Sequence, residues 1–520
     1  MCKPLLEHEP LPAPAWVPDD KTVESIQPLL AKVDEEFIKS WDEAELKPVA
    51  ETDLLTWVRR VSLALMGTIP SIQEIRELEK QPKDSQRIWW LSHVLTDRRY
   101  ADYMAERFAR VYVGVEEGPF LIYRRRRFVS WLSDMFLNNL SYDQLAYKLI
   151  TAKGIWTTKP EANFITVTAQ NNNPDEIRLA GRFTRAFLGL RMDCMQCHDD
   201  QFGGDWKQED FHQLASYFAG SKMSISGVMD NDKKDYKVKL HKRGEEEVLE
   251  ERVPFAQELY VEKGAKRERL ANWVTHKEHP SFARAFVNRV WALLYGKPLV
   301  EPIDHIPLEG PFPPSLELLS KDFIEHNFNI RRLVAAIVLS RPYKLQSYSE
   351  DDDLNISFSH YEKYAAFPMT RLRPEQVAGS ILQASSLKVI DAESHILTRI
   401  IRYFQGNDFV KRYGDVGEDE FGAHGGTIPQ RLLMMNGKMV SKRTEDNLLM
   451  NAAAQLSVVT TNSSLAIKTA YLSVLSRYPS EDELMYFKAM LEGAAGKGRM
   501  RSMQDLYWSL FNSTEFSWSH

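Results

Sequence analysis

The chain has 520 residues, of which 43% are hydrophobic and 27% are charged, and this composition is typical of a globular protein long enough for two or three domains. Its 66 Lys and Arg residues against 72 Asp and Glu residues give a formal net charge of −6, which argues against a nucleic-acid partner. Charged residues interrupt every long apolar run, so the sequence predicts no transmembrane helix.

The start of the chain predicts an extended segment. Prolines are frequent there: Pro10, Pro12, Pro14 and Pro18. We interpret residues 1–33 as an extended N-terminal tether, and Met1 is followed by no apolar signal-peptide core. A cysteine followed by a flexible tether is how a mature bacterial lipoprotein begins, so Cys2 is a candidate lipid anchor. An incidental cysteine is the alternative.

Residues 34–221 carry the pattern of a first helical domain. Apolar residues recur three and four positions apart, as in Leu54, Val58, Val61 and Leu65, which places them on one face of a helix. The four arginines of residues 124–127 could bind an anionic partner or lipid head groups. A solvated helix face explains this run equally well.

Two of the three cysteines lie in the motif Cys194-Met-Gln-Cys197-His198. This is the spacing of covalent c-type haem attachment, in which two thiols bind the vinyl groups of one porphyrin and the adjacent imidazole can bind the iron. The motif therefore predicts haem c attached at Cys194 and Cys197, with His198 as iron ligand. Three nearby residues are candidates for a sixth ligand: Met192, His212 and Met223.

Three other interpretations of the motif remain open. A Cys194–Cys197 disulfide would be structural or redox-active. A metal site could add a carboxylate from Asp199, Asp200 or Asp205 to the motif. The thiols could also be a reduced pair that only packs against its neighbours.

Residues 222–262 differ from the flanking sequence because charge runs and alternating polar and apolar residues replace the helical pattern. Such alternation indicates short strands. Helical periodicity returns over residues 263–520, so the predicted fold class is mainly α: two helical domains joined by a short β-containing linker.

Weaker constellations occur in the second half of the chain. Asp304-His305 could bind a divalent cation or act as an acid–base pair. A metal-dependent hydrolase would require Asp304, His305 or the Asp199/Asp200 pair to converge with other ligands. His276 and His279 are three positions apart, but Pro280 favours a turn. No Ser-His-Asp or His-Glu-x-x-His arrangement is present, so no catalytic residue is assigned.

Several stretches resemble one family in order along roughly residues 53–516. Residues 187–199, with Trp206 and Phe211, resemble the core motif of the DUF1549 domain, also called the planctomycete cytochrome-associated domain. Leu270-Ala-Asn-Trp273, Val287-Asn-Arg-Val-Trp291 and Arg373-Pro-Glu-Gln376 resemble its partner, the DUF1553 domain. The family usually reads Cys-His-Asp-His-Pro-Phe, whereas this chain has Asp200 and Gln201 in place of the second His and the Pro.

The resemblance implies an exported protein of the periplasm or cell envelope, associated with redox proteins in some relatives, and it implies no particular reaction. The leading hypothesis is therefore an envelope protein that binds haem c and transfers electrons to a redox or envelope protein partner. The second is a non-enzymatic envelope protein with a Cys194–Cys197 disulfide that binds a partner. The third is the metal-dependent hydrolase.

Overall fold

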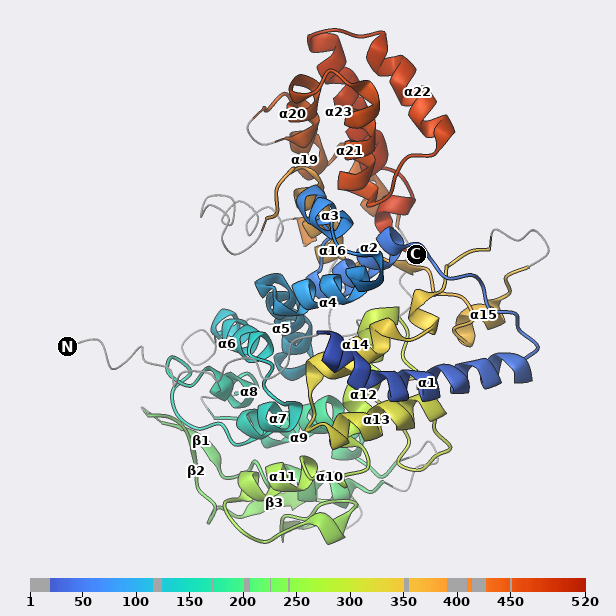
Figure 1. Ribbon diagram of the computed structural model, residues 1–520. Helices are drawn as coiled ribbons and strands as arrows, with labels where there is room; N and C mark the ends of the chain where they lie inside the picture. Colours follow the sequence, from blue (N-terminus) through green and yellow to red (C-terminus); the bar gives the residue numbers. More distant parts are fainter. Residues whose placement is uncertain are drawn as a thin grey trace. The chain divides into compact units, whose positions relative to one another are not determined.

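The computed structural model describes residues 19–115, 124–169, 173–200, 206–224, 226–241, 244–349, 355–390, 409–410, 412–413, 427–448 and 451–520. Within these ranges the chain is mainly α-helical, and its strands form two-stranded antiparallel sheets (Figure 1). The predicted fold class is confirmed, including the short β-containing segment between helical regions.

The chain forms two compact units, and each is built from segments that are separated in the sequence. The first unit contains Met104–Leu293 and Lys297–Ile337, and the second contains the described residues of Val17–Tyr103, Leu294–Gly296 and Val338–His520. The compact units therefore divide the chain differently from the predicted domains of residues 34–221 and 263–520. Periodicity shows which face of a helix is buried, but it does not show which distant helix covers that face.

Most or all of each of ten helices lies in the first unit: α5 (Arg98–Val113), α6 (Arg125–Leu137), α7 (Tyr142–Ile150), α8 (Asn163–Thr166), α9 (Glu176–Phe183), α10 (Gln208–Ala215), α11 (Lys266–Val274), α12 (Phe282–Tyr295), α13 (Pro314–Glu325) and α14 (Ile330–Leu339). Aromatic rings fill the core between them. Phe286 of α12 has its ring centroid 5.3 Å from Phe108, 3.8 Å from Tyr142 and 5.3 Å from Phe323. This one side chain therefore joins α5, α7 and α13 to α12.

Two hairpins of the first unit account for the predicted β-containing segment. Strand β1 (Ser221–Ser224) pairs with β2 (Gly227–Asp230), and β3 (Tyr236–Lys239) pairs with β4 (Glu246–Leu249). The first hairpin is fixed by a bridge in which Gly154 and Val228 exchange two backbone hydrogen bonds of 2.9 Å. Gly227 has φ +92°, and a Cβ there would lie 2.1 Å from the Gly154 carbonyl, so only glycine fits this approach.

The second unit holds the remaining described helices: α1 (Asp20–Glu43), α2 (Leu54–Met66), α3 (Ile72–Glu79), α4 (Gln86–Thr96), α15 (Phe358–Glu362), α16 (Pro374–Ala384), α18 (Ile428–Asn436), α19 (Lys438–Arg443), α20 (Ala452–Val459), α21 (Ser463–Leu475), α22 (Glu481–Glu492) and α23 (Lys497–Phe511). Leu63 of α2 shares one buried cluster with Val377 of α16 and Ile467 of α21. The Gln376 side chain donates to the Leu63 carbonyl at 2.9 Å. These contacts place α2 in the same unit as the C-terminal helices.

The N-terminal prediction requires a correction, because α1 already begins at Asp20 and not after residue 33. Asp19 caps the helix by accepting from the Thr22 backbone at 2.8 Å. Val23, Ile26 and Leu30 are buried at helical spacing, so a buried apolar face stabilises helix where proline-rich composition suggested a tether. Residues 1–18, and with them the candidate lipid anchor Cys2, lie outside the described residues.

Among the described residues, no helix has both the length and the apolar character needed to cross a bilayer. This agrees with the prediction from the sequence.

Helix α21 ends in a strained residue whose replacement we expect to stabilise the protein. Ser476 has φ +58°, is 1% exposed, and its hydroxyl has no hydrogen-bond partner. Ser476→Gly should raise the free energy of unfolding by about 1 kcal/mol, because glycine adopts this conformation freely and leaves no buried hydroxyl unsatisfied. Chemical denaturation measures the change. Ser473→Gly, one turn earlier in ordinary helix, should instead lower stability by about 1 kcal/mol.

Candidate functional site

The Cys-x-x-Cys-His motif forms one exposed turn of the first unit. Asp193–Gln196 (η4) is a 3₁₀ turn, and the Cys197 amide donates to the Cys194 carbonyl at 3.4 Å. Side chains three positions apart in such a turn lie on the same side. Cys194 and Cys197 are exposed, whereas Met195 between them is 3% exposed and anchors the turn in the core. The two thiols therefore face solvent together.

The His198 ring is oriented by its neighbour. Its Nδ1 lies 2.7 Å from the Asp199 carbonyl oxygen. A carbonyl can only accept, so Nδ1 carries the proton and Nε2 keeps its lone pair. Metal-binding histidines are commonly oriented by this type of hydrogen bond. The half-buried His198 is thus held in the tautomer that an iron ligand requires.

Helix α10 fixes both sides of the motif. The Gln196 carbonyl accepts from Gln208 Nε2 at 3.1 Å and from His212 Nε2 at 3.0 Å. The Gln208 backbone amide also donates to Asp199 Oδ1 at 2.9 Å. The residues that precede and follow Cys197-His198 are therefore held by a single helix, which makes the turn rigid without using the thiols.

His212 supports the site and offers no free nitrogen to an iron. Its Nε2 donates to Gln196, and its Nδ1 accepts from the Tyr236 hydroxyl at 2.7 Å. Burial lowers the pKa of His212, and the bond to Gln196 opposes this only partly, so the ring is neutral. Of the other two candidate sixth ligands, Met192 is fully buried and Met223 is half-buried in β1.

The helix before the motif changes its geometry along its length. Helix α9 continues as a π-helix, Thr184–Leu188 (η3), which ends at Gly189 with φ +63°. A Cβ at Gly181 would lie 2.2 Å from Asp193 Oδ1, so this glycine allows the motif to approach α9 closely. π-Helical turns are frequent at functional sites, and the sequence carries no clear signal for them.

Tertiary structure brings residues near 304 to the same region. Arg191 Nη2 lies 2.7 Å from Asp304 Oδ2, and the Ile306 amide donates to the Gly189 carbonyl at 2.8 Å. Asp304 is therefore occupied by an ion pair with the segment that precedes Cys194. Its neighbour His305 is exposed. This juxtaposition could not be read from the sequence.

The proposed metal ligands do not converge in the described part of the chain. There, the one group of three side chains with metal-like spacing is Glu74, His93 and Asp97, in the second unit. It contains none of the predicted residues Asp199, Asp200, Asp304 and His305, and Asp205 lies outside the described residues. Among the residues that the structure describes, the hydrolase hypothesis therefore has no set of three converging ligands.

The Glu74 group already contains a cation. The Arg99 guanidinium bonds to Glu74 and lies 2.6 Å from Asp97 Oδ2, and His93 Nε2 lies 2.8 Å from Glu74 Oε1. Burial alone would raise the pKa of Glu74, but His93 and Arg99 hold it well below its usual value. The group is therefore a buried ion-pair network and not a metal site.

The other sequence candidates have structural partners. Arg125, in the run of four arginines, lies 2.7 Å from Glu106, and Arg124 stacks over Trp156. Arg289 is buried and donates to the Arg185 carbonyl at 3.3 Å. His279 is buried at the start of α12, where its ring accepts from backbone amides. These contacts explain the residues without a catalytic role.

The disulfide hypothesis is not what the structure shows, because Cys194 and Cys197 are both free thiols. They lie on one turn and each is accessible to solvent, so no fold-stabilising cross-link holds this loop. Hydrogen bonds from α10 do this instead.

The attachment residues fit haem c, which requires two accessible thiols and an imidazole with a free nitrogen. The aromatic side chains near the motif do not form a pocket for this group. Phe183, Phe187 and Phe218 precede or follow the motif, and all three are buried. The ring centroid of Phe183 lies 5.7 Å from that of Phe187 and 6.1 Å from that of Phe218. They form core packing and not an open crevice, so a haem at this turn would keep an exposed face.

Two family models match the chain. The model described as "Protein of unknown function (DUF1549)" matches residues 32–223, which include the whole motif, and the model described as "Protein of unknown function (DUF1553)" matches residues 266–398. No curated protein and no solved structure matches the chain.

Proposed function

The chain belongs to the proteins that combine a DUF1549 domain with a DUF1553 domain, and we propose that it is a cell-envelope protein that carries haem c at Cys194, Cys197 and His198. In this role it transfers single electrons to or from a protein partner. The envelope location follows from the chemistry, because haem is attached to this motif outside the cytoplasm.

One observation carries the proposal. On a single turn, two exposed thiols face the same side and the next residue is an imidazole whose Nδ1 is bonded to Asp199 at 2.7 Å. A packing role for the thiols would favour burial. The Nδ1 bond of His198 leaves Nε2 with a lone pair that can bind a metal.

The haem, when bound, supplies a reversible one-electron change at iron. The protein would hold the haem and its histidine ligand in place. Asp199 orients His198, and His212 and Gln208 hold the turn through the Gln196 carbonyl. Because both thiols are exposed, a haem attached to them would lie where a protein partner could approach it.

The test is intact mass spectrometry with a visible spectrum, on protein exported in a host that matures c-type haem. We expect a mass gain of one haem and a Soret band that survives acid–acetone extraction. Both should be lost in Cys194→Ala/Cys197→Ala. His241→Ala is the matched control, because this exposed residue contacts Gln208 through its backbone only.

A colourless protein would overturn the proposal. If its mass were two hydrogens below that of the reduced chain, the thiols would have oxidised to a disulfide. The partner-binding hypothesis would then take precedence. A haem retained in the double variant would show non-covalent binding and would also contradict attachment at this motif.

A further inference from the structure

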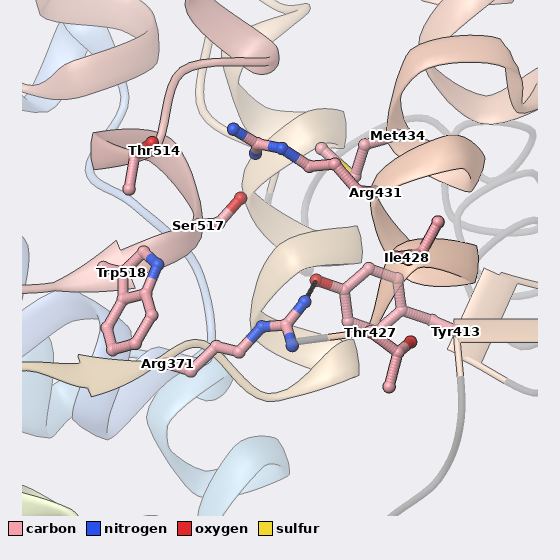
Figure 2. Close-up of a pocket in the computed structure, with 9 residues that line it drawn as sticks. All are labelled: Arg371, Tyr413, Thr427, Ile428, Arg431, Met434, Thr514, Ser517 and Trp518. Carbon is pink, nitrogen blue, oxygen red and sulfur yellow. Dashed lines mark hydrogen bonds between the residues drawn. The ribbon is translucent and has the colours of Figure 1, made fainter. Parts of the chain in front are cut away.

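The second unit contains a cavity of about 260 Å³ (Figure 2). Nine residues line it: Arg371, Tyr413, Thr427, Ile428, Arg431, Met434, Thr514, Ser517 and Trp518. They come from four separate stretches of sequence. Figure 2 shows Arg371 and Arg431 reaching into the space from opposite sides, with Ser517 between them.

The walls of this cavity are fixed by regular structure. Arg371 lies in β5 (Thr370–Arg371), which pairs with β6 (Trp518–Ser519), and Arg371 is directly opposite Trp518. Arg431 and Met434 lie on α18, one turn apart, and Met434 is buried in the core. Gln430 of the same helix donates to the Tyr413 carbonyl at 2.7 Å. The two guanidinium groups are thus mounted on elements tied to the core.

Neither arginine is neutralised within the described part of the chain. Arg371 donates to the Tyr413 hydroxyl at 2.9 Å and lies over the same ring, and both partners are uncharged. Arg431 is exposed and has no ion pair there. By contrast, Arg477 in the same unit lies within 2.8 Å of Glu483 and 2.7 Å of Glu515. Among the described residues, the cavity is therefore lined by two arginines that have no anionic partner.

The amino end of helix α18 adds partial positive charge to the cavity. The N-cap residue Thr427 and the first residue of the helix, Ile428, both line the cavity. The amino end of a helix carries partial positive charge and favours anions nearby. The remaining lining consists of hydroxyls and of the apolar surfaces of Trp518, Met434 and Ile428.

We propose that this cavity binds a small organic anion, a carboxylate or a phosphate monoester on a flat or apolar body. Guanidinium groups form paired hydrogen bonds with the oxygens of both anions, and the Ser517 and Thr514 hydroxyls are placed to add to them. The Trp518 ring and Met434 contact the body. The volume of about 260 Å³ lies just below the range of roughly 300–1,000 Å³ for drug-sized ligands, so the ligand is small.

Calorimetric titration of the full chain with benzoate, phenyl phosphate, inorganic phosphate and benzyl alcohol tests the proposal. We expect benzoate or phenyl phosphate to bind and the neutral alcohol not to bind. Affinity should fall as salt is raised, because added ions screen the guanidinium charges. Comparing the affinities for benzoate and phenyl phosphate shows whether the site prefers a carboxylate or a phosphate. Comparing phenyl phosphate with inorganic phosphate shows how much the organic body contributes to affinity.

Variants locate the site. Arg431→Gln and Arg371→Gln should each weaken binding at least tenfold. Because Arg431 is exposed, we expect its variant to keep the fold. Circular dichroism tests whether the Arg371 variant is also folded. The matched control is Arg501→Gln, an exposed arginine on α23 of the same unit, which should bind as the parent does.

Three results would overturn the proposal: no anion binds, benzyl alcohol binds as well as the anions, or Arg501→Gln weakens binding as much as Arg431→Gln. None of these results depends on haem, so the proposed electron-transfer function is tested separately.

Discussion

Arg267→Ala is expected to lower the free energy of unfolding of the first unit by about 3–5 kcal/mol. Arg267 is 1% exposed and donates to the Ile150 carbonyl at 2.7 Å and to the Ala152 carbonyl at 2.9 Å. It also donates to both carboxylate oxygens of Asp230 at 2.9 Å and 3.0 Å. One side chain thus joins α11 to the end of α7 and to strand β2.

The large effect has an electrostatic cause. Truncation leaves the Asp230 carboxylate buried, and among the described residues the half-exposed Lys153 at 3.3 Å is then its one remaining ion-pair partner. Removing one partner of a buried ion pair leaves the other charge buried and uncompensated. This loss of stability is far larger than the difference in stability between the intact ion pair and a well-packed apolar pair. The two carbonyls also lose their donor, and each buried unsatisfied group costs about 1–3 kcal/mol.

Urea denaturation measures the effect, and hydrogen exchange of peptides from α7, β2 and α11 shows where it acts. Arg252→Ala is the control, because Arg252 is exposed and bonds only to Gln257 at 3.2 Å. Its effect should stay within about 0.5 kcal/mol. The double variant Arg267→Ala/Asp230→Ala should lose less than the sum of the single variants. Strict additivity would show that the two side chains are not coupled.

The stability of the first unit is expected to fall as pH is lowered from about 6.5 to about 3 because of His279. Its Nδ1 accepts from the backbone amides of Ser281 and Phe282, each at 3.3 Å, and therefore stays unprotonated. The ring packs against Trp273, with centroids 4.5 Å apart. Burial, and to a smaller degree the nearby His276, lowers the pKa of His279 to about 3.

The sign follows from proton binding. Between the two pKa values the unfolded chain takes up a proton at this position and the folded chain does not, so acid favours unfolding. The contribution is fully present above the unfolded pKa of about 6.5 and declines by at most about 1.4 kcal/mol per pH unit below it. Down to pH 3 the total is roughly 4 kcal/mol.

Denaturation at a series of pH values tests this expectation, with His279→Asn as the variant. Asparagine can still accept from the first amides of α12, but it does not titrate. We expect the variant to be less stable at pH 7 by about 1–2 kcal/mol, because it fills less of the site. Its stability should then depend much less on pH between 6.5 and 4.

The exposed His305 provides the control for this prediction. His305→Asn should leave the pH dependence of the parent unchanged. An unchanged pH dependence in His279→Asn would mean that other groups cause the acid sensitivity.

The sequence by itself determined the local features of this protein. Apolar spacing predicted the helical class, and alternation predicted the short strands of residues 222–262, because both signals depend on neighbours a few positions apart. The spacing of Cys194, Cys197 and His198 likewise placed two thiols and an imidazole on one turn. At residues 20–33 local composition misled, since proline frequency outweighed the buried face formed by Val23, Ile26 and Leu30.

Tertiary structure alone decided what lies around these features. It grouped α2 with the C-terminal helices, bonded one nitrogen of His212 to the motif and the other to Tyr236, and paired Asp304 with Arg191 across more than a hundred positions. It also brought Arg371 and Arg431 to one cavity. Periodicity records that a face is buried but not its distant partner, because contacts between remote residues depend on the packing of the whole chain.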